Sequence, residues 1–243
     1  MSIKCSFDWE DTGHYAKWDN DTGEVLTTTF PCQFKDDFDG PDLVIPAAAE
    51  SGCKWRKTIV NSATVAKSAN TSNGEIACVL DSTEEAQTGA IYQGDQKTWS
   101  VEQGLILETR IKVFVTPTLV AEAVFGLTAN TGVPDSIGES IFFTVDGSTS
   151  IFCEKDDGST DQTVDSDLTA LTTQWKIYRI DCTNTANIKF FIDNVQVATG
   201  TTFGFAATGA SAILQPWLGL YKASGAGVGT ILIDYVKLFQ NRS

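Results

Sequence analysis

Apolar and polar residues alternate along most of this chain with a period of two, the pattern of β-strands that bury one face. Residues 105–115 are the clearest case, because apolar side chains occupy one predicted face and charged side chains the other. The apolar face consists of Leu105, Leu107, Ile111, Val113 and Val115, and the charged face of Glu108, Arg110 and Lys112. Helical periodicity is almost absent, and the stretch 46–52 (PAAAESG) predicts a single helical turn at most.

Strands cut by Gly, Asn, Asp, Ser and Thr account for nearly the whole chain. We predict them over residues 3–9, 25–30, 75–80, 105–115, 121–127, 140–145, 150–154, 175–181, 188–193, 195–200, 214–221 and 230–239. Polar stretches at 11–24, 128–139 and 156–173 predict loops. Asp146–Gly147 and Asp193–Asn194 predict tight hairpin turns, because both dipeptides tolerate positive φ. The pattern predicts an all-β fold, a two-sheet antiparallel sandwich in one domain.

The charge of the chain limits its partners. It carries 31 acidic and 17 basic residues, which gives a net charge of -14. This charge opposes binding to nucleic acid and to anionic membranes. The start, MSIKCSFDWEDTG, lacks the pattern of a signal peptide, so we expect the protein to be made and folded in a cytoplasm.

The cysteines and the single histidine do not indicate a zinc site or a Ser-His-Asp site. The 6 cysteines are widely spaced without a CxxC pair, which argues against a zinc site and favours buried, reduced thiols. The single histidine, His14, lies in a predicted acidic loop and has no evident partners for a Ser-His-Asp site.

Three stretches occur in an order that resembles a known superfamily. They are DDFDGPDL at 36–43 followed by Trp55, the pair WKIYRID and IKFFIDN at 175–194, and GTILIDYVKLFQ at 229–240. The combination resembles the concanavalin A-like lectin/glucanase superfamily, which includes laminarinases and laminin-G-like modules. The resemblance implies a jelly-roll sandwich whose closing strand returns beside the first. It starts near residue 30, so we expect an N-terminal arm over 1–29 and the sandwich over 30–243.

The glucanases that the chain resembles carry their carboxylates on one strand in an E-x-D-x-(x)-E pattern. Alternation places those side chains on the concave face, and a retaining mechanism needs two carboxyl groups about 5 Å apart. In the predicted strands Glu108 stands alone, Asp8 and Glu10 lie too near the N-terminus, and Asp135 and Glu139 flank a loop. We therefore expect no catalytic residues and predict that the chain is not an enzyme.

Tryptophan is the residue type that most favours carbohydrate binding, since an exposed indole stacks on a sugar ring. Trp55, Trp175 and Trp217 lie in or beside apolar strands and are expected to pack in the core. Trp9 and Trp18 flank the acidic N-terminal segment and are the candidates for contact with a glycan or with another protein.

Asp234 interrupts the apolar closing strand, where an unpaired carboxylate would be costly. We expect it to share a face with Leu232, Val236 and Leu238. The resemblance implies a structural Ca²⁺ held by Asp234 together with backbone carbonyls of the DDF region. The alternative is that backbone amides or a nearby Lys or Arg satisfy the carboxylate.

A sandwich without catalytic residues, with an acidic charge and an N-terminal arm, resembles virion proteins of tailed bacteriophages. We predict a capsid decoration or cement protein that binds the capsid lattice and itself. Such a protein is assembled in the host cytoplasm and carried in the virion. The alternative function is a carbohydrate-binding module or adhesin that recognises host glycans.

Overall fold

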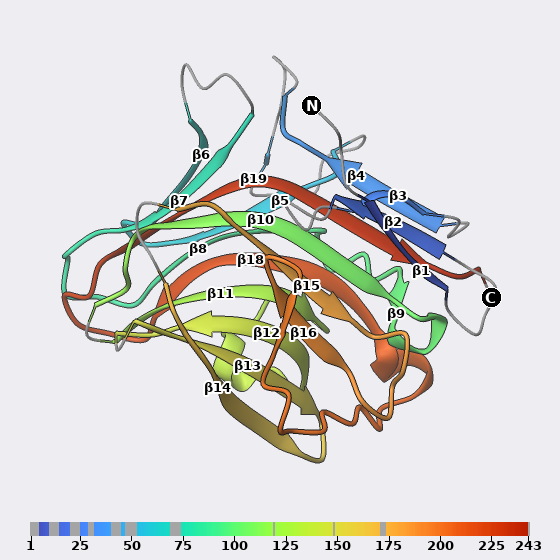
Figure 1. Ribbon diagram of the computed structural model, residues 1–243. Coiled ribbons are helices and arrows are strands. Elements are labelled where there is room, and N and C mark those ends of the chain that lie inside the picture. Colours follow the sequence, from blue (N-terminus) through green and yellow to red (C-terminus); the bar gives the residue numbers. More distant parts are fainter. Residues whose placement is uncertain are drawn as a thin grey trace.

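The computed structural model describes a β-sandwich with an additional small sheet (Figure 1). The described residues are 5–9, 15–19, 25–28, 32–39, 45–46, 53–68, 74–118, 120–147, 149–170 and 174–242. Both sandwich sheets are antiparallel and have 8 strands each, which confirms the predicted all-β, concanavalin A-like sandwich. Figure 1 draws the two sheets as arches, with β19 and β10 above β18 and β11.

One sandwich sheet, here called the β19 sheet, has the order β17-β16-β15-β10-β19-β7-β6, and β4 also pairs with β19. Its strands are β4 (Cys32–Asp36), β6 (Thr64–Lys67), β7 (Ile76–Leu80), β10 (Ile106–Val115), β15 (Lys176–Asp181), β16 (Lys189–Ile192), β17 (Val195–Val197) and β19 (Gly229–Gln240). The closing strand β19 therefore returns beside β4, as the resemblance implied.

The other sandwich sheet, here called the β18 sheet, has the order β14-β13-β12-β11-β18-β8-β5, and β9 also pairs with β18. Its strands are β5 (Arg56–Val60), β8 (Gln87–Tyr92), β9 (Trp99–Ser100), β11 (Ala121–Thr128), β12 (Glu139–Val145), β13 (Ser150–Asp157), β14 (Asp161–Thr169) and β18 (Ile213–Lys222). Short 3-10 turns connect some strands: η1 (Val101–Gln103), η2 (Pro134–Ser136) and η3 (Gly209–Ala212).

The N-terminal strands form a sheet of their own, with the order β1-β2-β3. The strands are β1 (Cys5–Trp9), β2 (Tyr15–Asp19) and β3 (Val25–Thr28). The predicted loop over 11–24 therefore contains a strand. The boundary predicted at residue 29 falls between this sheet and β4, and the division into an arm and a sandwich stays a prediction.

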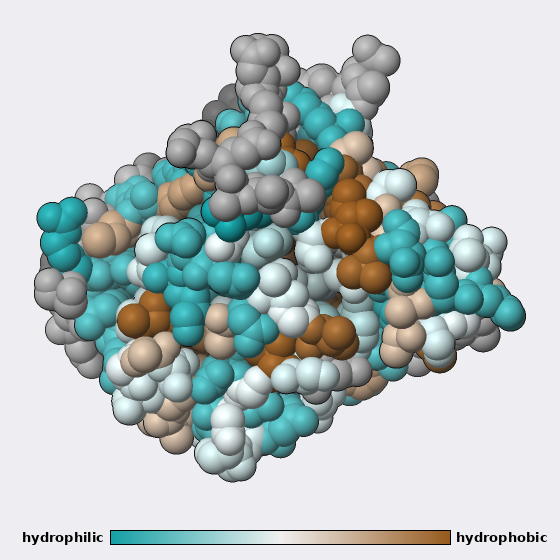
Figure 2. Space-filling model, turned by 180° about the vertical axis from the view of Figure 1, so that it is seen from behind, coloured by the Kyte–Doolittle hydropathy of each residue, from teal (hydrophilic) through white to brown (hydrophobic). Residues whose placement is uncertain are grey.

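The main core lies between the two sandwich sheets and follows the predicted alternation. On β10, Leu107, Ile111 and Val113 are buried in this core, whereas Arg110 and Lys112 lie on the opposite face. Val115 departs from the prediction and is exposed, because the register with β19 shifts after Val113. Trp55 also belongs to the core, as predicted. Figure 2 shows the face of the molecule that Figure 1 hides, where apolar atoms gather in separate patches between hydrophilic ones.

Two local predictions about turns have different outcomes. Asp193 and Asn194 both have positive φ, of 49° and 64°, which confirms a tight turn between β16 and β17. The turn at Asp146–Gly147 is longer than predicted, because Thr149 donates its N–H to the Asp146 carbonyl at 3.2 Å and itself takes a φ of 71°.

The predicted helical turn at 46–52 lies almost wholly outside the described residues. Within the described part, no helix has the length and hydropathy to span a membrane.

Candidate functional site on the outer face of the β18 sheet

A second apolar cluster lies on the face of the β18 sheet that points away from the main core. This outer aromatic cluster consists of Ala90, Tyr92, Val124, Phe142, Trp217 and Tyr221. Strand alternation explains it, since these residues occupy the positions between those that enter the core. In the register, Trp217 lies opposite Tyr92 on β8 and opposite Gly126 on β11.

Gly126 lies between Phe142 and Trp217 and lets their rings approach each other. Phe142 lies opposite Gly126 on the side away from Trp217, so the three residues form one row across β12, β11 and β18. A Cβ atom at Gly126 would lie 3.0 Å from Cδ1 of Phe142 and 2.2 Å from the Ile141 carbonyl oxygen. The rings of Phe142 and Trp217 meet edge to face, with centroids 6.5 Å apart.

Two polar groups on this outer face are buried without a hydrogen-bond partner among the described residues. They are Nε1 of Trp217 and Oγ of Ser140, which lies two residues before Phe142 on β12. A buried donor without a partner costs about 1–3 kcal/mol, so native proteins keep few of them. Both atoms are shielded from solvent in this structure, so an acceptor from outside the chain reaches them only when a neighbouring side chain moves.

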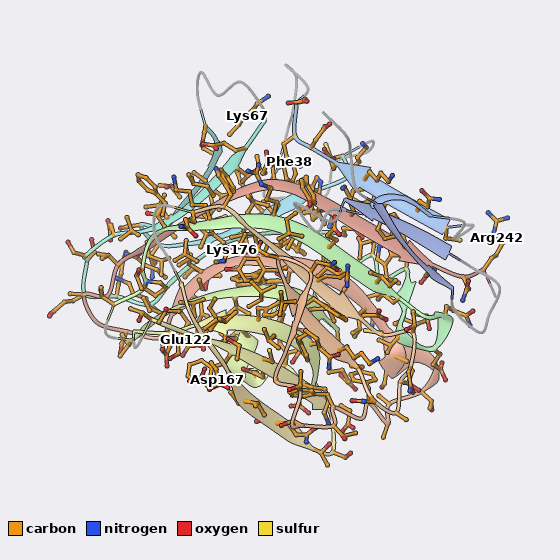
Figure 3. The ribbon with its side chains drawn as sticks, viewed as in Figure 1. Phe38, Lys67, Glu122, Asp167, Lys176 and Arg242 are labelled. Atoms are coloured by element: carbon orange, nitrogen blue, oxygen red, sulfur yellow. The ribbon has the colours of Figure 1, made fainter. Side chains whose placement is uncertain are left out.

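Carboxylates lie beside this cluster on the neighbouring strands. Glu154 and Asp156 of β13 are the cross-strand partners of Phe142 and Ser140, and Asp161 and Asp165 of β14 face β13 in turn. These four residues are called the acidic strip below. Asp161 is directly opposite Asp156. Figure 3 shows Asp167, further along β14, and Glu122 of β11 at the same end of the sheet.

The acidic strip corrects the sequence prediction for this region. We predicted a strand ending at residue 154 and a loop over 156–173, but β13 continues to Asp157 and β14 follows at 161–169. Glu154 and Asp156 therefore alternate on one face and supply the E-x-D part of the glucanase pattern. Gly158 and Ser159 stand where the pattern would have its last glutamate.

A buried ion pair explains why the strand was missed. Lys155 and Asp157 occupy core-facing positions that apolar residues would normally fill, so the sequence resembles a polar loop. Nζ of Lys155 lies 3.2 Å from Oδ2 of Asp157, and both side chains are almost fully buried. Lys155 also donates to the carbonyl oxygen of Thr160 at 3.1 Å, which holds the turn between β13 and β14.

Asp157 is held as a carboxylate by several donors. Burial opposes its charged form, but N–H groups of Ala206, Ser159 and Thr160 and the hydroxyl of Ser159 donate to it, and together they hold the pKa of Asp157 well below its usual range. The pair lines an open groove of about 730 Å³, which Phe205 and Thr185 also line.

Polar contacts border the outer aromatic cluster at both strand ends. At one end Nε2 of Gln215 donates to Oδ1 of Asp95 at 2.7 Å, and Arg56 donates to the Gly94 carbonyl oxygen at 3.1 Å. At the other end the hydroxyl of Tyr221 donates to Oε2 of Glu122 at 3.2 Å. These hydrogen bonds provide partners for the polar groups at both ends of the cluster.

Asp234 lies on the outer face of the other sandwich sheet. Its Oδ2 is 2.6 Å from Nη1 of Arg110, whose guanidinium lies over the ring of Trp175 with 5.0 Å to the centroid. The structure therefore contains the alternative partner we considered, an arginine. No group of three or more His, Cys, Asp or Glu residues in the described part could hold a metal, and the Ca²⁺ site stays a prediction.

A β-bulge changes the face assignment of β19. The register to β10 shifts between Ile233 and Tyr235, so Asp234 and Tyr235 both lie outside the core between Ile233 and Val236. The prediction that Val236 and Leu238 share the face of Asp234 is wrong, because both are in the core. The DDF region does lie near Asp234, because Asp36 is the cross-strand partner of Val236 on β19.

The predictions for the other tryptophans have different outcomes. Trp217 is buried, but in the outer aromatic cluster and not in the main core. Trp175 is half-buried against Arg110 and is not a core residue. Trp9 and Trp18 lie on β1 and β2, and their side chains are outside the described part, as are His14 and Glu10. Their role in contact with a glycan or a partner stays a prediction.

The other carboxylates that we considered as catalytic candidates lie apart from the outer aromatic cluster. Glu108 is fully buried on the outer face of the β19 sheet, where it accepts from the Tyr235 hydroxyl at 3.0 Å and from Nζ of Lys237 at 3.3 Å. Glu139 begins β12 opposite Asp157. Asp8 is on β1, and the side chain of Asp135 is outside the described part.

Comparison with known proteins agrees with this architecture. No protein-family model and no curated protein matches the chain. Among solved structures, an endo-1,3-β-glucanase from Streptomyces sioyaensis has a TM-score of 0.56 at 14% identity, covering 86% of this chain and 96% of its own. A pseudo β-1,3-glucanase of Mycobacterium tuberculosis has a TM-score of 0.56 at 16% identity, with 86% and 98% covered. The Crh5 transglycosylase has a TM-score of 0.55 at 14% identity, with 87% and 84% covered.

At these identities the likeness shows the fold: the chain is a glucanase-like, concanavalin A-like β-sandwich. The comparison overturns our prediction that the chain is not an enzyme, because the structures that share its fold include named glucanases and a transglycosylase. We had excluded activity because no predicted strand carried the catalytic pattern, but the predicted strand 150–154 ended before Asp156, which β13 includes. A role in a phage virion draws no support from these structures.

Proposed function

We propose that the outer face of the β18 sheet binds a glycan, and that Glu154 and Asp156 are the carboxylates that face the bound chain. The observation that carries the proposal is the pair of unpartnered donors, Trp217 Nε1 and Ser140 Oγ, beside an aromatic cluster. Glycans offer what this face lacks, because they combine many hydroxyl acceptors with apolar ring faces. The glucanases that share the fold support the same class of ligand.

Glu154 and Asp156 provide two carboxyl groups that can take part in a reaction of the bound glycan. Residues two apart on a strand have Cα atoms about 6.6 Å apart, so Glu154 and Asp156 reach the same stretch of ligand. A pair of carboxyl groups at such spacing can divide the work of protonating a glycosidic oxygen and stabilising the positive charge that develops on the sugar. Glu154 and Asp156 are thus the residues to test for hydrolysis or transfer.

Ser140→Ala is the sharpest test of binding. Because the Ser140 hydroxyl has no hydrogen-bond partner within the described part of the fold, its removal should leave the unfolding free energy unchanged or higher. We expect that result together with weaker binding to neutral oligosaccharides on a glycan array and in titration calorimetry. Full-strength binding by Ser140→Ala, or silence of the wild-type chain on every glycan, would overturn the proposal.

Catalysis is tested separately by measuring reducing ends released from β-1,3-glucan. We expect Glu154→Gln and Asp156→Asn to abolish any release while oligosaccharide binding persists. Glu75→Gln and Asp37→Asn are the matched controls, because both residues lie on the side of the β19 sheet. Equal release by the two β13 variants and their controls would assign the chemistry to other residues.

A virion role for this chain remains a second proposal, with the capsid lattice and further copies of the chain as partners. It rests on the acidic charge of -14 and on the separate N-terminal sheet. Deletion of residues 1–24 should abolish attachment to a particle while the sandwich stays folded. Attachment that survives the deletion would contradict it.

A further inference from the structure

The groove beside the Lys155–Asp157 ion pair is a cavity that the proposed function does not use. Its volume of about 730 Å³ lies within the range of roughly 300–1,000 Å³ that is typical of sites for small ligands. Two parts of the chain line it, the turn between β13 and β14 and the connections that flank β16 and β17. Figure 1 shows these connections in orange beside that turn. The groove therefore lies at the edge of the β18 sheet, next to its last strand, β14.

Hydrogen bonds link the two parts of the chain that line the groove. The N–H of Ala206 donates to Oδ2 of Asp157 at 3.0 Å, and Nε2 of Gln162 donates to the Thr202 carbonyl oxygen at 3.4 Å. These bonds fix the relative position of the two parts. A ligand in the groove would therefore not have to order a loop when it binds, which is a cost that weakens many complexes.

The lining of the groove is polar and close to neutral. Lys155 and Asp157 neutralise each other, and Asp161, which is exposed, is the remaining charged residue among those that line the groove. The hydroxyls of Ser159 and Thr160 donate to Asp157. Further uncharged side chains with hydrogen-bonding groups are those of Gln162, Thr185 and Thr202. A neutral ligand rich in hydroxyl groups, such as a glycan, fits this lining better than an ionic ligand does.

Asp161 connects the groove with the proposed glycan site. Ser140, Asp156 and Asp161 are successive cross-strand partners on β12, β13 and β14, so they form a row that ends at the edge of the sheet. Asp161 also lines the groove. A glycan that lies along this row would reach the groove where it crosses β14.

We propose that the groove is a second subsite, which receives the end of a long glycan bound on the outer face of the β18 sheet. This inference rests on the proposed function and names its ligand class, a neutral oligosaccharide long enough to cross β14. Because one chain occupies both subsites, binding of its end in the groove is intramolecular and adds affinity. A short oligosaccharide occupies the outer face alone.

The test is titration calorimetry of the full chain with a trisaccharide and an octasaccharide of β-1,3-glucan. We expect the wild type to bind the octasaccharide about tenfold more tightly than the trisaccharide. Gly204→Leu should lower the affinity for the octasaccharide to that for the trisaccharide and leave the trisaccharide unchanged. Among the described residues, a Cβ at Gly204 would meet only the Ala186 carbonyl oxygen at 3.7 Å, so a side chain that fills the groove has room.

Gly200→Leu is the matched control, because Gly200 does not line the groove and a Cβ there would have no described atom within 4 Å. Ala186→Trp blocks the groove a second time from an exposed position, and it should act as Gly204→Leu does even if Gly204→Leu lowers the melting temperature. Equal affinities of the wild type for both lengths, or an octasaccharide affinity that neither blocking variant lowers, would overturn the second subsite and leave binding on the outer face intact. Absence of binding to both oligosaccharides would overturn this inference, and the proposed function as well if the glycan array is also silent.

Discussion

At the scale of single residues, the buried Lys155–Asp157 ion pair depends on many compensating hydrogen bonds. A charge in a protein interior is stable only when other groups replace the lost water. Here the oxygens of Asp157 accept from Ala206, Ser159 and Thr160 as well as from Lys155. The pair thereby joins the turn between β13 and β14 to the segment around residue 206, and it supports the strand that carries Glu154 and Asp156.

Asp157→Asn should lower the unfolding free energy by about 3 kcal/mol, because it leaves Lys155 buried without a counter-charge. The pKa of Asp157 is lowered in the folded state, so its contribution is fully present above the unfolded pKa near 4 and is lost as pH falls through the lower folded value. Urea unfolding of both proteins between pH 7 and about pH 3 measures this. A difference that does not shrink in acid would contradict it, and Asp37→Asn should leave stability unchanged.

Asp234 gives a second prediction at this scale. The ion pair with Arg110 already neutralises the carboxylate, and Arg110 is about one-third exposed, with a side-chain exposure of 34%. We expect Asp234→Asn to cost about 0.5–1 kcal/mol in urea unfolding. The melting temperature should not respond to a chelator. A drop in chelator that is absent in Asp234→Asn would favour the Ca²⁺ site.

At the scale of elements, the central strands of the β18 sheet depend on two glycines. Gly219 on β18 lies opposite Ala90 on β8, and a Cβ atom there would be 2.2 Å from the Cβ of Ala90 and 2.4 Å from the Gly89 carbonyl oxygen. Gly126 similarly leaves room for Phe142. Close approach of the strands, and not turn formation, requires glycine at these positions.

Gly219→Ala should therefore cost about 3 kcal/mol or more, because backbone and not a flexible side chain must move. The control is Gly138→Ala, since a Cβ at Gly138 would meet only the Cα of Gly158 at 3.9 Å. Thermal unfolding of the two variants compares them directly. Similar melting temperatures would mean that β18 and β8 adjust more easily than this packing implies.

At the scale of the whole molecule, the chain consists of a sandwich and a separate small sheet. Within the described residues, β1–β3 pair with one another, whereas β4 joins the β19 sheet. The main core draws its buried residues from the described residues of the sandwich. The sandwich therefore holds all the parts of the proposed glycan site.

Removal of residues 1–29 should leave the sandwich folded, since the part of the chain that the structure describes has no backbone ladder between β3 and β4. We expect the melting temperature to change by no more than a few degrees, the size of effect that about 1 kcal/mol produces in a domain of this length. Glycan binding should be retained. A loss of cooperative unfolding would show that the sandwich needs the N-terminal sheet.

The sequence by itself determined the class of fold and most of the strands. Alternation is a local property, so the apolar face of 105–115 and the turn at Asp193–Asn194 are both visible in short windows. The resemblance also predicted the return of the closing strand beside β4. These features require knowledge only of neighbouring residues or of the order of motifs.

Only the tertiary structure decided where the candidate site lies. β13 and β14 resemble a polar loop because Lys155 and Asp157, which neutralise each other in the interior, occupy core-facing positions that apolar residues would normally fill. One further donor to Asp157, the N–H of Ala206, is distant in sequence. The bulge at Asp234 and Tyr235 arises from the register with β10 and reverses the local alternation. Trp217 looks the same in sequence whether it faces the core or the outer side of the sheet. Long-range pairing sets these outcomes, because it decides which strands are neighbours and which of their two faces meets the core.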